Sequence, residues 1–213
     1  MRNVFITGGT GYIGQRLIPE LLGRGHAVRA LVRNGSEGKL AAGAVAVRGN
    51  PLDRATFAGQ VAPSDTFVQL VGVPHPSPKK ARQFREIDLV SVTESAAAAR
   101  GAGVAHFVYL SVAQPAPVMR DYVAVRAEGE RLVREAGMAA TFVRPWYVLG
   151  PGHRWPYAIL PLYWVWALSP KSRDTARRLY PVTLRSVVRA IADAVDRPAE
   201  GVRIIEAPEL RRL

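Results

Sequence analysis

Gly8, Gly11 and Gly14 are spaced as G-x-x-G-x-x-G between an apolar run and an amphipathic segment. Glycine lets the chain turn tightly and brings backbone N–H groups close to a phosphate, and the start of a helix favours negative charge. A strand, this turn and a helix together form the arrangement that binds the pyrophosphate of a dinucleotide. The sequence therefore predicts a dinucleotide site made by Gly8, Thr10, Gly11, Tyr12, Ile13 and Gly14.

An arginine follows the next apolar run, where Arg33 comes directly after Leu31 and Val32. In dinucleotide-binding folds this strand ends beside the adenosine ribose, where an acid binds a 2′-hydroxyl and an arginine accepts a 2′-phosphate. No Asp or Glu ends the run, so the sequence predicts NADP(H) in preference to NAD(H), with Arg33 on the 2′-phosphate and Arg29 as a weaker helper. The alternative is an ordinary surface arginine.

Short apolar runs alternate with longer helix-like segments along most of the chain. This order is typical of βαβ units and predicts an α/β fold, a Rossmann-type doubly wound and mostly parallel sheet. We expect the second, third and fourth strands to be buried on both faces. The predicted strands are 3–7, 27–32, 44–47, 66–71, 106–110, 141–144 and 202–205. The predicted helices are 11–24, 53–60, 79–100, 121–135 and 184–195.

The chain has 213 residues, of which 48% are apolar. This is enough for one sizeable core, and no linker justifies a cut, so we expect a single domain over 1–213. Within it, prolines at 151, 156, 161 and 170 punctuate an aromatic stretch. We predict that 146–182 forms a small substrate-side region or lid near the C-terminus.

Composition excludes several other classes of site. The sequence has no cysteine, so disulfides, thiolate metal sites and a cysteine nucleophile are excluded. Its four histidines are scattered without ligand spacing, and we expect no metal. The net charge of +12 is spread along the chain, so nucleic acid is not an expected partner. The sequence shows no signal peptide and no run of roughly 20 apolar residues, which predicts a cytoplasmic protein.

Five segments together carry a family resemblance: TGGTGYIG at 7–14, RGNPLD at 48–53, VYLS at 108–111, YVAVR at 122–126 and VRPWYVLGPG at 143–152. They resemble the atypical short-chain dehydrogenase/reductase superfamily, most closely its small NAD(P)-binding, NmrA-like members and their sugar-nucleotide epimerase relatives. The resemblance covers the chain from residue 1 to about 205. The first motif is specific for the superfamily and the last for its epimerase-like and atypical branches, and neither identifies a substrate.

The resemblance implies further cofactor contacts in the loops that follow three of the strands. Open α/β sheets bind their ligands at this edge, which agrees with the positions. The implied contacts are Asn50, Leu52 and Asp53 at the adenine, Val71, Gly72 and Val73 along the cofactor, and Pro145 and Trp146 near the nicotinamide.

The resemblance also implies a catalytic set. In these dehydrogenases a serine after the fifth strand orients the reacting group, a tyrosine relays a proton, and a lysine four residues later serves the tyrosine and the ribose. Ser111 and Tyr122 match, but position 126 is Arg126. The spacing places Tyr122 and Arg126 on one helix face, where the cation can lower the pKa of the phenol. A planar, permanently charged guanidinium does not replace a lysine conservatively at a proton relay.

The sequence thus predicts an NADP(H)-binding oxidoreductase, or an epimerase-like enzyme, that acts on a small carbonyl or hydroxyl compound through Ser111, Tyr122 and Arg126. Arg126 in place of lysine keeps open a non-catalytic NADP(H)-binding redox sensor or accessory protein. A third hypothesis is a membrane-peripheral helper that docks through the aromatic and basic residues of 155–178. The same aromatics are also suited to cover the nicotinamide pocket or to form a homodimer patch.

Overall fold

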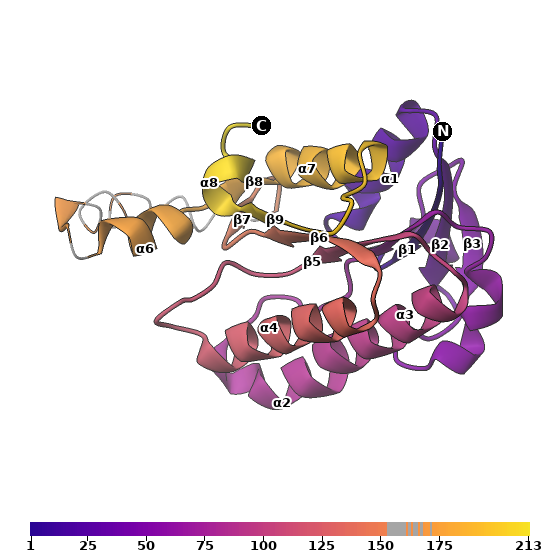
Figure 1. Cartoon of the computed structure of the whole chain (residues 1–213), viewed down its shortest axis with the longest axis horizontal. Helices are drawn as coiled ribbons and strands as arrows, with labels where there is room; N and C mark the ends of the chain where they lie inside the picture. The colour runs from indigo at the N-terminus through magenta and orange to yellow at the C-terminus, as the bar shows by residue number, and fades with distance from the viewer. Residues whose placement is uncertain (153–160, 162, 164–165, 167, 171) are drawn as a thin grey trace.

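The computed structural model describes residues 1–152, 161, 163, 166, 168–170 and 172–213. Its central sheet has seven strands, and every neighbouring pair is parallel. The strands are β1 (Asn3–Thr7), β2 (Ala27–Val32), β3 (Val45–Arg48), β4 (Thr66–Gln69), β5 (His106–Leu110), β6 (Ala139–Arg144) and β9 (Val202–Glu206). Their order is β3-β2-β1-β4-β5-β6-β9, so the chain builds outward from β1 and then, from β4, in the opposite direction (Figure 1). The prediction of a doubly wound, Rossmann-type α/β fold is confirmed.

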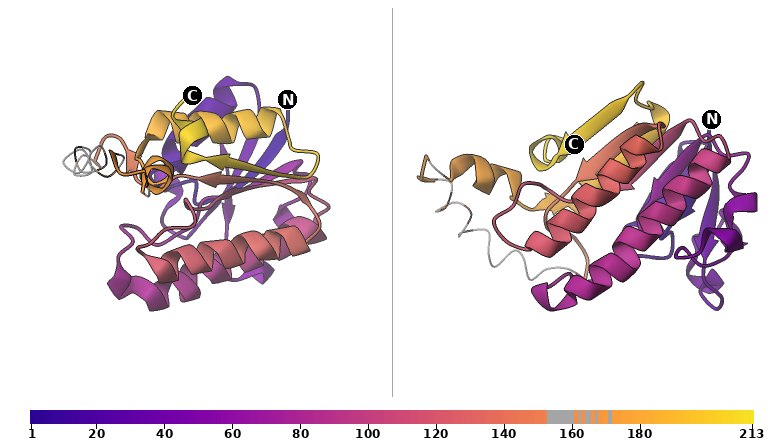
Figure 2. Two further views of the ribbon diagram at one scale, coloured as in Figure 1. Left: turned by 60° about the vertical axis from the view of Figure 1, so that its left-hand side comes forward. Right: turned by 60° about the horizontal axis from the view of Figure 1, so that its bottom comes forward.

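Helices cover both faces of the sheet (Figure 1, Figure 2). Leu17 and Leu21 are fully buried where the first helix meets β1, and Phe67 stacks between Phe5 and Phe107 on the other face, with ring centres 5.2 Å apart in each pair. Apolar side chains therefore bind a helical layer to each side of the strands. One layer holds α1 (Gly14–Gly23), α7 (Leu184–Asp196) and α8 (Ala207–Leu210), and the other holds α3 (Val90–Gly101) and α4 (Arg120–Glu135).

The predicted helix 79–100 is interrupted in the structure. It consists of a 3₁₀ turn at η4 (Pro78–Lys80), a short α2 (Ala81–Gln83), a π-helical segment η5 (Phe84–Leu89) and then α3. The two buried residues of η5 are Phe84 and Asp88. π-segments are rare and are frequent at functional sites, and here one brings a carboxylate into the interior.

The predicted helix 53–60 is instead two 3₁₀ turns, η2 (Arg54–Thr56) and η3 (Ala58–Gln60), and it covers one side of β3. Our expectation that β3 is buried on both faces is wrong. Val45 is 59% exposed and only Val47 of this strand is buried. The reason is position, because β3 lies at the edge of the sheet and pairs with a strand on one side only.

The predicted substrate-side segment 146–182 lies partly outside the described residues. Its described ends pair as two short parallel strands that the sequence did not predict, β7 (Val148–Leu149) and β8 (Val182–Thr183). Tyr163 and Leu179 pack on Ala113, and α6 (Arg173–Arg178) lies beyond the sheet (Figure 1). Among the residues described, no helix is both long and apolar enough to span a bilayer.

Burial of a histidine makes the fold sensitive to acid. His106 begins β5, is 1% exposed, and has its Nε2 2.9 Å from Thr141 Oγ1. Burial first, and then the charge of Arg2, lowers the pKa of His106 from 6.5 to about 4. His106 therefore binds a proton near pH 6.5 in the unfolded chain but only near pH 4 in the folded chain. The free energy of unfolding consequently decreases as the pH falls from 6.5 toward 4.

We expect this residue alone to lower the free energy of unfolding by about 2 kcal/mol between pH 7 and pH 5. Urea denaturation at both pH values measures it. In His106→Asn the acid-dependent loss is expected to shrink by that amount. His75→Asn, which changes an exposed histidine at a positive φ that asparagine also adopts, is the matched control and keeps the full loss. Equal pH dependence in the two variants would contradict the assignment.

Candidate cofactor and catalytic site

The glycine turn lies between β1 and α1 and is held by its own backbone. Gly8 has φ +80°, the N–H of Gly11 donates to Gly8 O at 3.0 Å, and the N–H of Gln15 donates to Gly11 O at 3.0 Å. A Cβ on Gly14 would lie 2.4 Å from Gly8 O, and one on Gly8 would lie 2.9 Å from the carbonyl carbon of Leu70. Gly8 and Gly14 therefore allow the turn, the helix and the end of β4 to meet in close contact.

Gly11 has a different part in the turn. It is exposed, and a Cβ there would meet only Gly8 O, at 3.2 Å. A side chain at this position would displace protein atoms only slightly. The absence of one therefore leaves the outer surface of the turn accessible to a ligand. Within the described part of the chain, the N–H groups of Ile13 and Gly14 have no acceptor. These are the orphan donors of a helix start, and they suit an anion.

A cavity of about 330 Å³ opens beside this turn, at the carboxyl ends of β4, β5 and β6. It gathers residues that the sequence predicted from five separate segments. Most of the remaining lining is apolar, including Leu70, Leu110 and Val112. The predicted residues that line it are Tyr12, Ile13, Gly72, Val73, Ser111, Tyr122, Arg126, Pro145 and Trp146.

The residues predicted for the adenosine end lie outside this cavity, after β2 and β3. Arg33 is exposed, and among the described residues no carboxylate pairs with it. Arg29 donates instead to the carbonyl oxygen of Ala62 at 2.7 Å. Asn50 accepts from the N–H of Leu52 at 3.1 Å and so forms a local turn. Of the two arginines, Arg29 thus has a partner in the protein, and Arg33 is the more exposed.

Arg126 is buried on α4, with 4% of the residue exposed. Its Nη2 donates to Asp88 Oδ1 at 2.6 Å and its Nη1 donates to the carbonyl oxygen of Leu110 at 2.9 Å. The guanidinium carbon lies 5.2 Å from the ring centre of Tyr122, a cation–π distance. Burial opposes its charged form, but Tyr122, Tyr109 and Asp88 together raise the pKa of Arg126 above its usual value.

Asp88 joins this cation to the loop after β4. Its Oδ2 accepts the N–H of Val73 at 3.0 Å, and its side chain has no exposed surface. A Cβ on Gly72 would lie 2.2 Å from Arg126 Nη2, so this glycine lets the loop pass across the guanidinium. Burial raises the pKa of Asp88, although Arg126 and the Val73 N–H act in the opposite direction.

The phenol of Tyr122 keeps its proton at neutral pH. Burial raises the pKa of Tyr122 above its ordinary value of 10, and Arg126 pulls in the opposite direction without overcoming burial. The expected lowering by Arg126 is therefore present but outweighed. The group in the cavity is a neutral proton donor next to a fixed positive charge.

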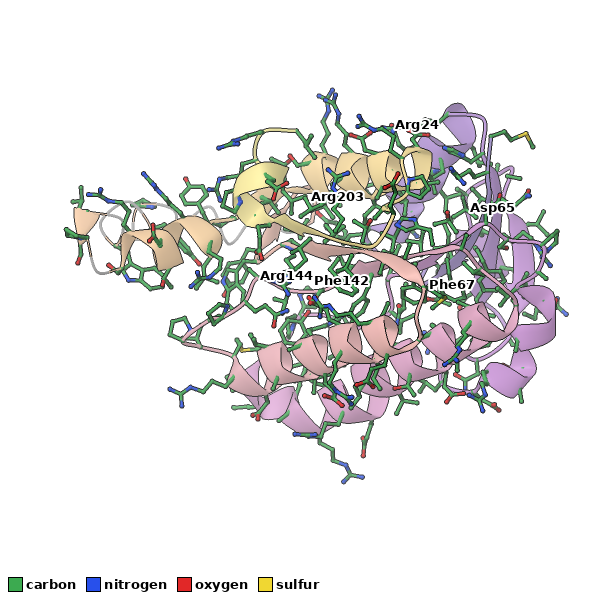
Figure 3. The ribbon with its side chains drawn as sticks, viewed as in Figure 1. Arg24, Asp65, Phe67, Phe142, Arg144 and Arg203 are labelled. Carbon is green, nitrogen blue, oxygen red and sulfur yellow. The ribbon has the colours of Figure 1, made fainter. Side chains whose placement is uncertain are left out.

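Ser111 is buried, and its hydrogen bond has an internal acceptor. Its Oγ donates to Glu130 Oε1 at 2.7 Å, and the same carboxylate accepts from Gln114 Nε2 at 2.8 Å and from Arg144 Nη2 at 2.6 Å. Arg144 extends from the end of β6 into the layer below the sheet, where it joins α4 (Figure 3). Because the serine proton is engaged with Glu130, its oxygen lone pairs are what Ser111 offers to a ligand.

A sequence model of NAD(P)H-binding proteins matches residues 8–158, which is more than half of the chain. The chain belongs to this NAD(P)H-binding family. It is 32% identical to the ceramide reductase of Caulobacter vibrioides, over 70% of this chain and 47% of that protein. It is 29% identical to the 4-hydroxy-2-methyl-3-oxo-4-farnesyl-3,4-dihydroquinoline-1-oxide ketoreductase of Stigmatella aurantiaca, over 68% of this chain and 50% of that one. The chain thus spans about half the length of these relatives.

Solved structures support the fold of this NAD(P)H-binding protein. The enzyme WbmH of Bordetella bronchiseptica in complex with NAD⁺ has a TM-score of 0.71 at 20% identity, over 97% of this chain and 75% of that one. A short-chain dehydrogenase/reductase superfamily protein from Agrobacterium tumefaciens with bound NAD has a TM-score of 0.69 at 17% identity, over 96% of this chain and 77% of that one.

The geometry of the turn fits the cofactor of the family. A cradle that any Cβ at Gly8 or Gly14 would fill, and two unpaired N–H groups, suit a pyrophosphate. The apolar cavity beyond it suits a nicotinamide ring and a substrate. Within the described ranges no group of three or more His, Asp or Glu side chains is placed to hold a metal ion.

Sequence reasoning missed Asp88, Glu130 and Arg144. Each is a charged residue at an inward position of a helix or strand whose other inward residues are mostly apolar. A buried charge of this kind needs a partner and is rarely left without one. Two such acids and two such arginines in one chain are the signal that two buried ion pairs exist, but sequence spacing does not show which acid meets which arginine.

We expect Asp88→Asn to lower the free energy of unfolding by about 3 kcal/mol, because it leaves the buried guanidinium without its counter-charge. Glu86→Gln is the matched control. It makes the same chemical change on the same segment, but Glu86 is exposed and pairs with the exposed Arg82, so it is expected to change stability by less than about 0.5 kcal/mol. Urea denaturation compares the two. Similar losses would show that the Arg126 charge does not depend on Asp88.

Proposed function

We propose that this NAD(P)H-binding protein is an NADP(H)-dependent oxidoreductase that reduces a carbonyl group on a largely apolar compound, or oxidises the corresponding alcohol. The observation that carries the proposal is a protonated Tyr122 above a buried cation, inside an apolar cavity next to the dinucleotide turn. The names of the two relatives, a ketoreductase and a ceramide reductase, support reduction as the chemistry.

The bound nicotinamide supplies or accepts the hydride in this chemistry. Tyr122 does the acid–base work. As negative charge grows on the substrate oxygen during reduction, the phenol O–H transfers its proton to that oxygen, and the O–H bond of the product alcohol forms. The phenolate left behind is stabilised by Arg126, whose guanidinium carbon lies 5.2 Å from the ring centre. Tyr122 is mostly buried but keeps some exposed surface, through which water can return its proton.

Arg126 acts as a fixed charge and not as a proton carrier. Its guanidinium cannot release a proton in the accessible pH range, and Asp88 with the Leu110 carbonyl holds both terminal nitrogens. A lysine in this place can rotate toward a ribose, whereas this arginine is held under the phenol. We therefore assign Arg126 to stabilising the phenolate and Ser111 to accepting a hydrogen bond from the alcohol form of the substrate.

A second function is favoured by a specific observation: Ser111 and both terminal nitrogens of Arg126 already have partners inside the protein, although the buried Arg126 Nε has none among the described residues. The Ser111 hydroxyl donates its hydrogen bond to Glu130, and the terminal nitrogens of Arg126 donate to Asp88 and to the Leu110 carbonyl. A non-catalytic NADP(H)-binding sensor or accessory protein needs no more than this. A membrane-peripheral role through 155–178 stays a hypothesis, because much of that segment lies outside the described residues.

Tyr122→Phe separates the two functions. If the phenol relays the proton, the variant is expected to lose at least about 100-fold in kcat while its affinity for NADPH is unchanged. Turnover is measured as NADPH oxidation with a panel of aromatic and long-chain ketones. Tyr147→Phe, which removes a phenol from the same cavity, is the control and is expected to keep its rate. NADPH binding by the wild type without turnover of any ketone would favour the sensor.

The choice of dinucleotide is tested at Arg33, which is exposed and carries no ion pair among the described residues. Thermal-shift titration is expected to show tighter binding of NADP(H) than of NAD(H) by the wild type, because ligand binding raises the stability of the folded state. Arg33→Gln is expected to weaken NADP(H) binding about tenfold through loss of charge-assisted hydrogen bonds and to leave NAD(H) unchanged. Arg100→Gln, an exposed arginine on α3, is the control. A preference for NAD(H) that Arg33→Gln does not alter would refute the assignment.

A further inference from the structure

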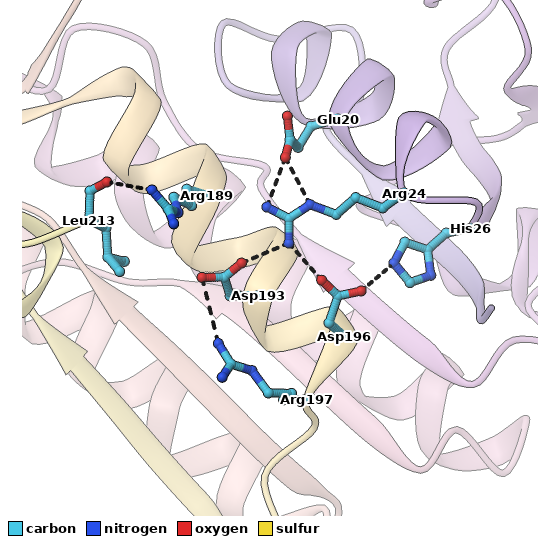
Figure 4. A network of polar contacts seen from close by, with 8 residues as sticks. All are labelled: Glu20, Arg24, His26, Arg189, Asp193, Asp196, Arg197 and Leu213. Carbon is cyan, nitrogen blue, oxygen red and sulfur yellow. Dashed lines mark hydrogen bonds and ion pairs between the residues drawn. The ribbon is translucent and has the colours of Figure 1, made fainter.

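Helices α1 and α7 pack side by side on one face of the sheet, and ion pairs join their carboxyl-terminal ends (Figure 4). Arg24, directly after α1, has its Nη1 2.7 Å from Asp193 Oδ1 and 2.6 Å from Asp196 Oδ2. His26 Nε2 lies 2.8 Å from the other oxygen of Asp196. At this end of the interhelical seam, Arg24 faces two carboxylates of α7, so its charge is paired.

Toward the amino-terminal end of the same seam, basic side chains outnumber acidic ones. There Arg16 on α1 and Arg185 and Arg189 on α7 line a groove of about 710 Å³. The groove also reaches Arg24, and the acid in its lining is Glu20, which lies 2.8 Å from Arg24 and pairs with it. Across the ranges that the structure describes, no carboxylate side chain pairs with Arg16, Arg185 or Arg189.

The three arginines make only weak contacts with the protein. The Arg16 guanidinium carbon lies 5.5 Å from the ring centre of Tyr12, and Arg189 donates to the main-chain oxygen of Leu213, the last residue of the sequence, at 3.2 Å (Figure 4). All three side chains belong to exposed residues. Like charges that converge on one groove repel each other, and an anion between them removes that repulsion.

Most of the other residues that line the groove are apolar. Its walls include Leu149, Pro151, Leu184 and Val188. The floor is tightly packed at Gly150, where a Cβ would lie 2.4 Å from Tyr12 Oη and 3.0 Å from Leu184 Cβ. None of the residues that line this groove lines the cavity at Tyr122, so it is a separate site.

We propose that this groove binds a phosphate group borne by a second ligand, with Arg185 and Arg189 as its main contacts and Arg16 opposite them. The planar fork of arginine matches phosphate oxygens with paired, charge-assisted hydrogen bonds. The apolar walls accept the organic part that carries the phosphate. The ligand is distinct from the dinucleotide, whose phosphates belong to the glycine turn and to Arg33.

The test uses the full chain with saturating NADPH, so that the dinucleotide site is filled before inorganic phosphate is added at constant ionic strength. Phosphate is expected to raise the thermal midpoint of the wild type. The double variant Arg185→Gln/Arg189→Gln is expected to bind phosphate at least about tenfold more weakly, and Arg16→Gln to weaken binding in the same direction. Without phosphate, the double variant is expected to be as stable as the wild type or more stable, because it removes facing like charges.

The matched control is Arg100→Gln/Arg203→Gln, which removes the same charge from two exposed arginines away from the groove and is expected to respond like the wild type. Cosedimentation with phosphatidylcholine vesicles, with and without phosphatidic acid, identifies the source of the phosphate. Binding only to phosphatidic acid vesicles, lost in the groove variant, assigns a lipid headgroup, and binding of inorganic phosphate without vesicle binding assigns a soluble ligand. Equal responses in the groove and control variants, or no response to either probe, would overturn the proposal.

Discussion

The ion pair between Arg126 and Asp88 is the constraint on which the candidate catalytic site depends. Two charges are removed from water, so each must be held by several partners at once. Asp88 meets this demand with Arg126 on one oxygen and the Val73 N–H on the other, and Arg126 meets it with Asp88 and the Leu110 carbonyl. In doing so the pair ties together α4, the π-helical segment, and the loops after β4 and β5. The position of the guanidinium under Tyr122 follows from these bonds.

The same pair explains how arginine serves where the related dehydrogenases have lysine. A planar guanidinium has room at this place because Gly72 has no side chain, since a Cβ there would lie 2.2 Å from Arg126 Nη2. The exchange gives up a mobile proton carrier and gains a fixed positive field beside the ring. Burial nevertheless keeps the Tyr122 pKa above its ordinary value, so in the proposed reaction the phenol acts as a neutral acid.

Local signals were sufficient for much of the fold. β1, β2 and β5 begin and end where apolar runs and glycines predict, and Gly8, Gly11 and Gly14 mark the turn by backbone chemistry alone. Other features arise only from packing. The spacing of apolar residues does not predict the π-helical segment Phe84–Leu89. That segment is associated with the buried position of Asp88, which sequence spacing does not show. The direction of the Ser111 proton depends on Glu130, which is 19 residues away in sequence but 2.7 Å away in space. The exposure of β3 depends on the order of strands in the sheet.

The net charge can be read from the sequence, but the places where charges are paired or unpaired are known only from the structure. The excess of 29 basic over 17 acidic residues is plain in composition, but its distribution is not. Several acids pair with arginines: the buried Asp88 with Arg126, the buried Glu130 with Arg144, and the more exposed Asp193 and Asp196 with Arg24. Because basic residues are in excess, other arginines, such as Arg16 and Arg185, pair with no carboxylate side chain among the described residues. Where such arginines gather around a concave, partly apolar surface, the field is focused on one place, and an anionic ligand becomes the natural counter-charge.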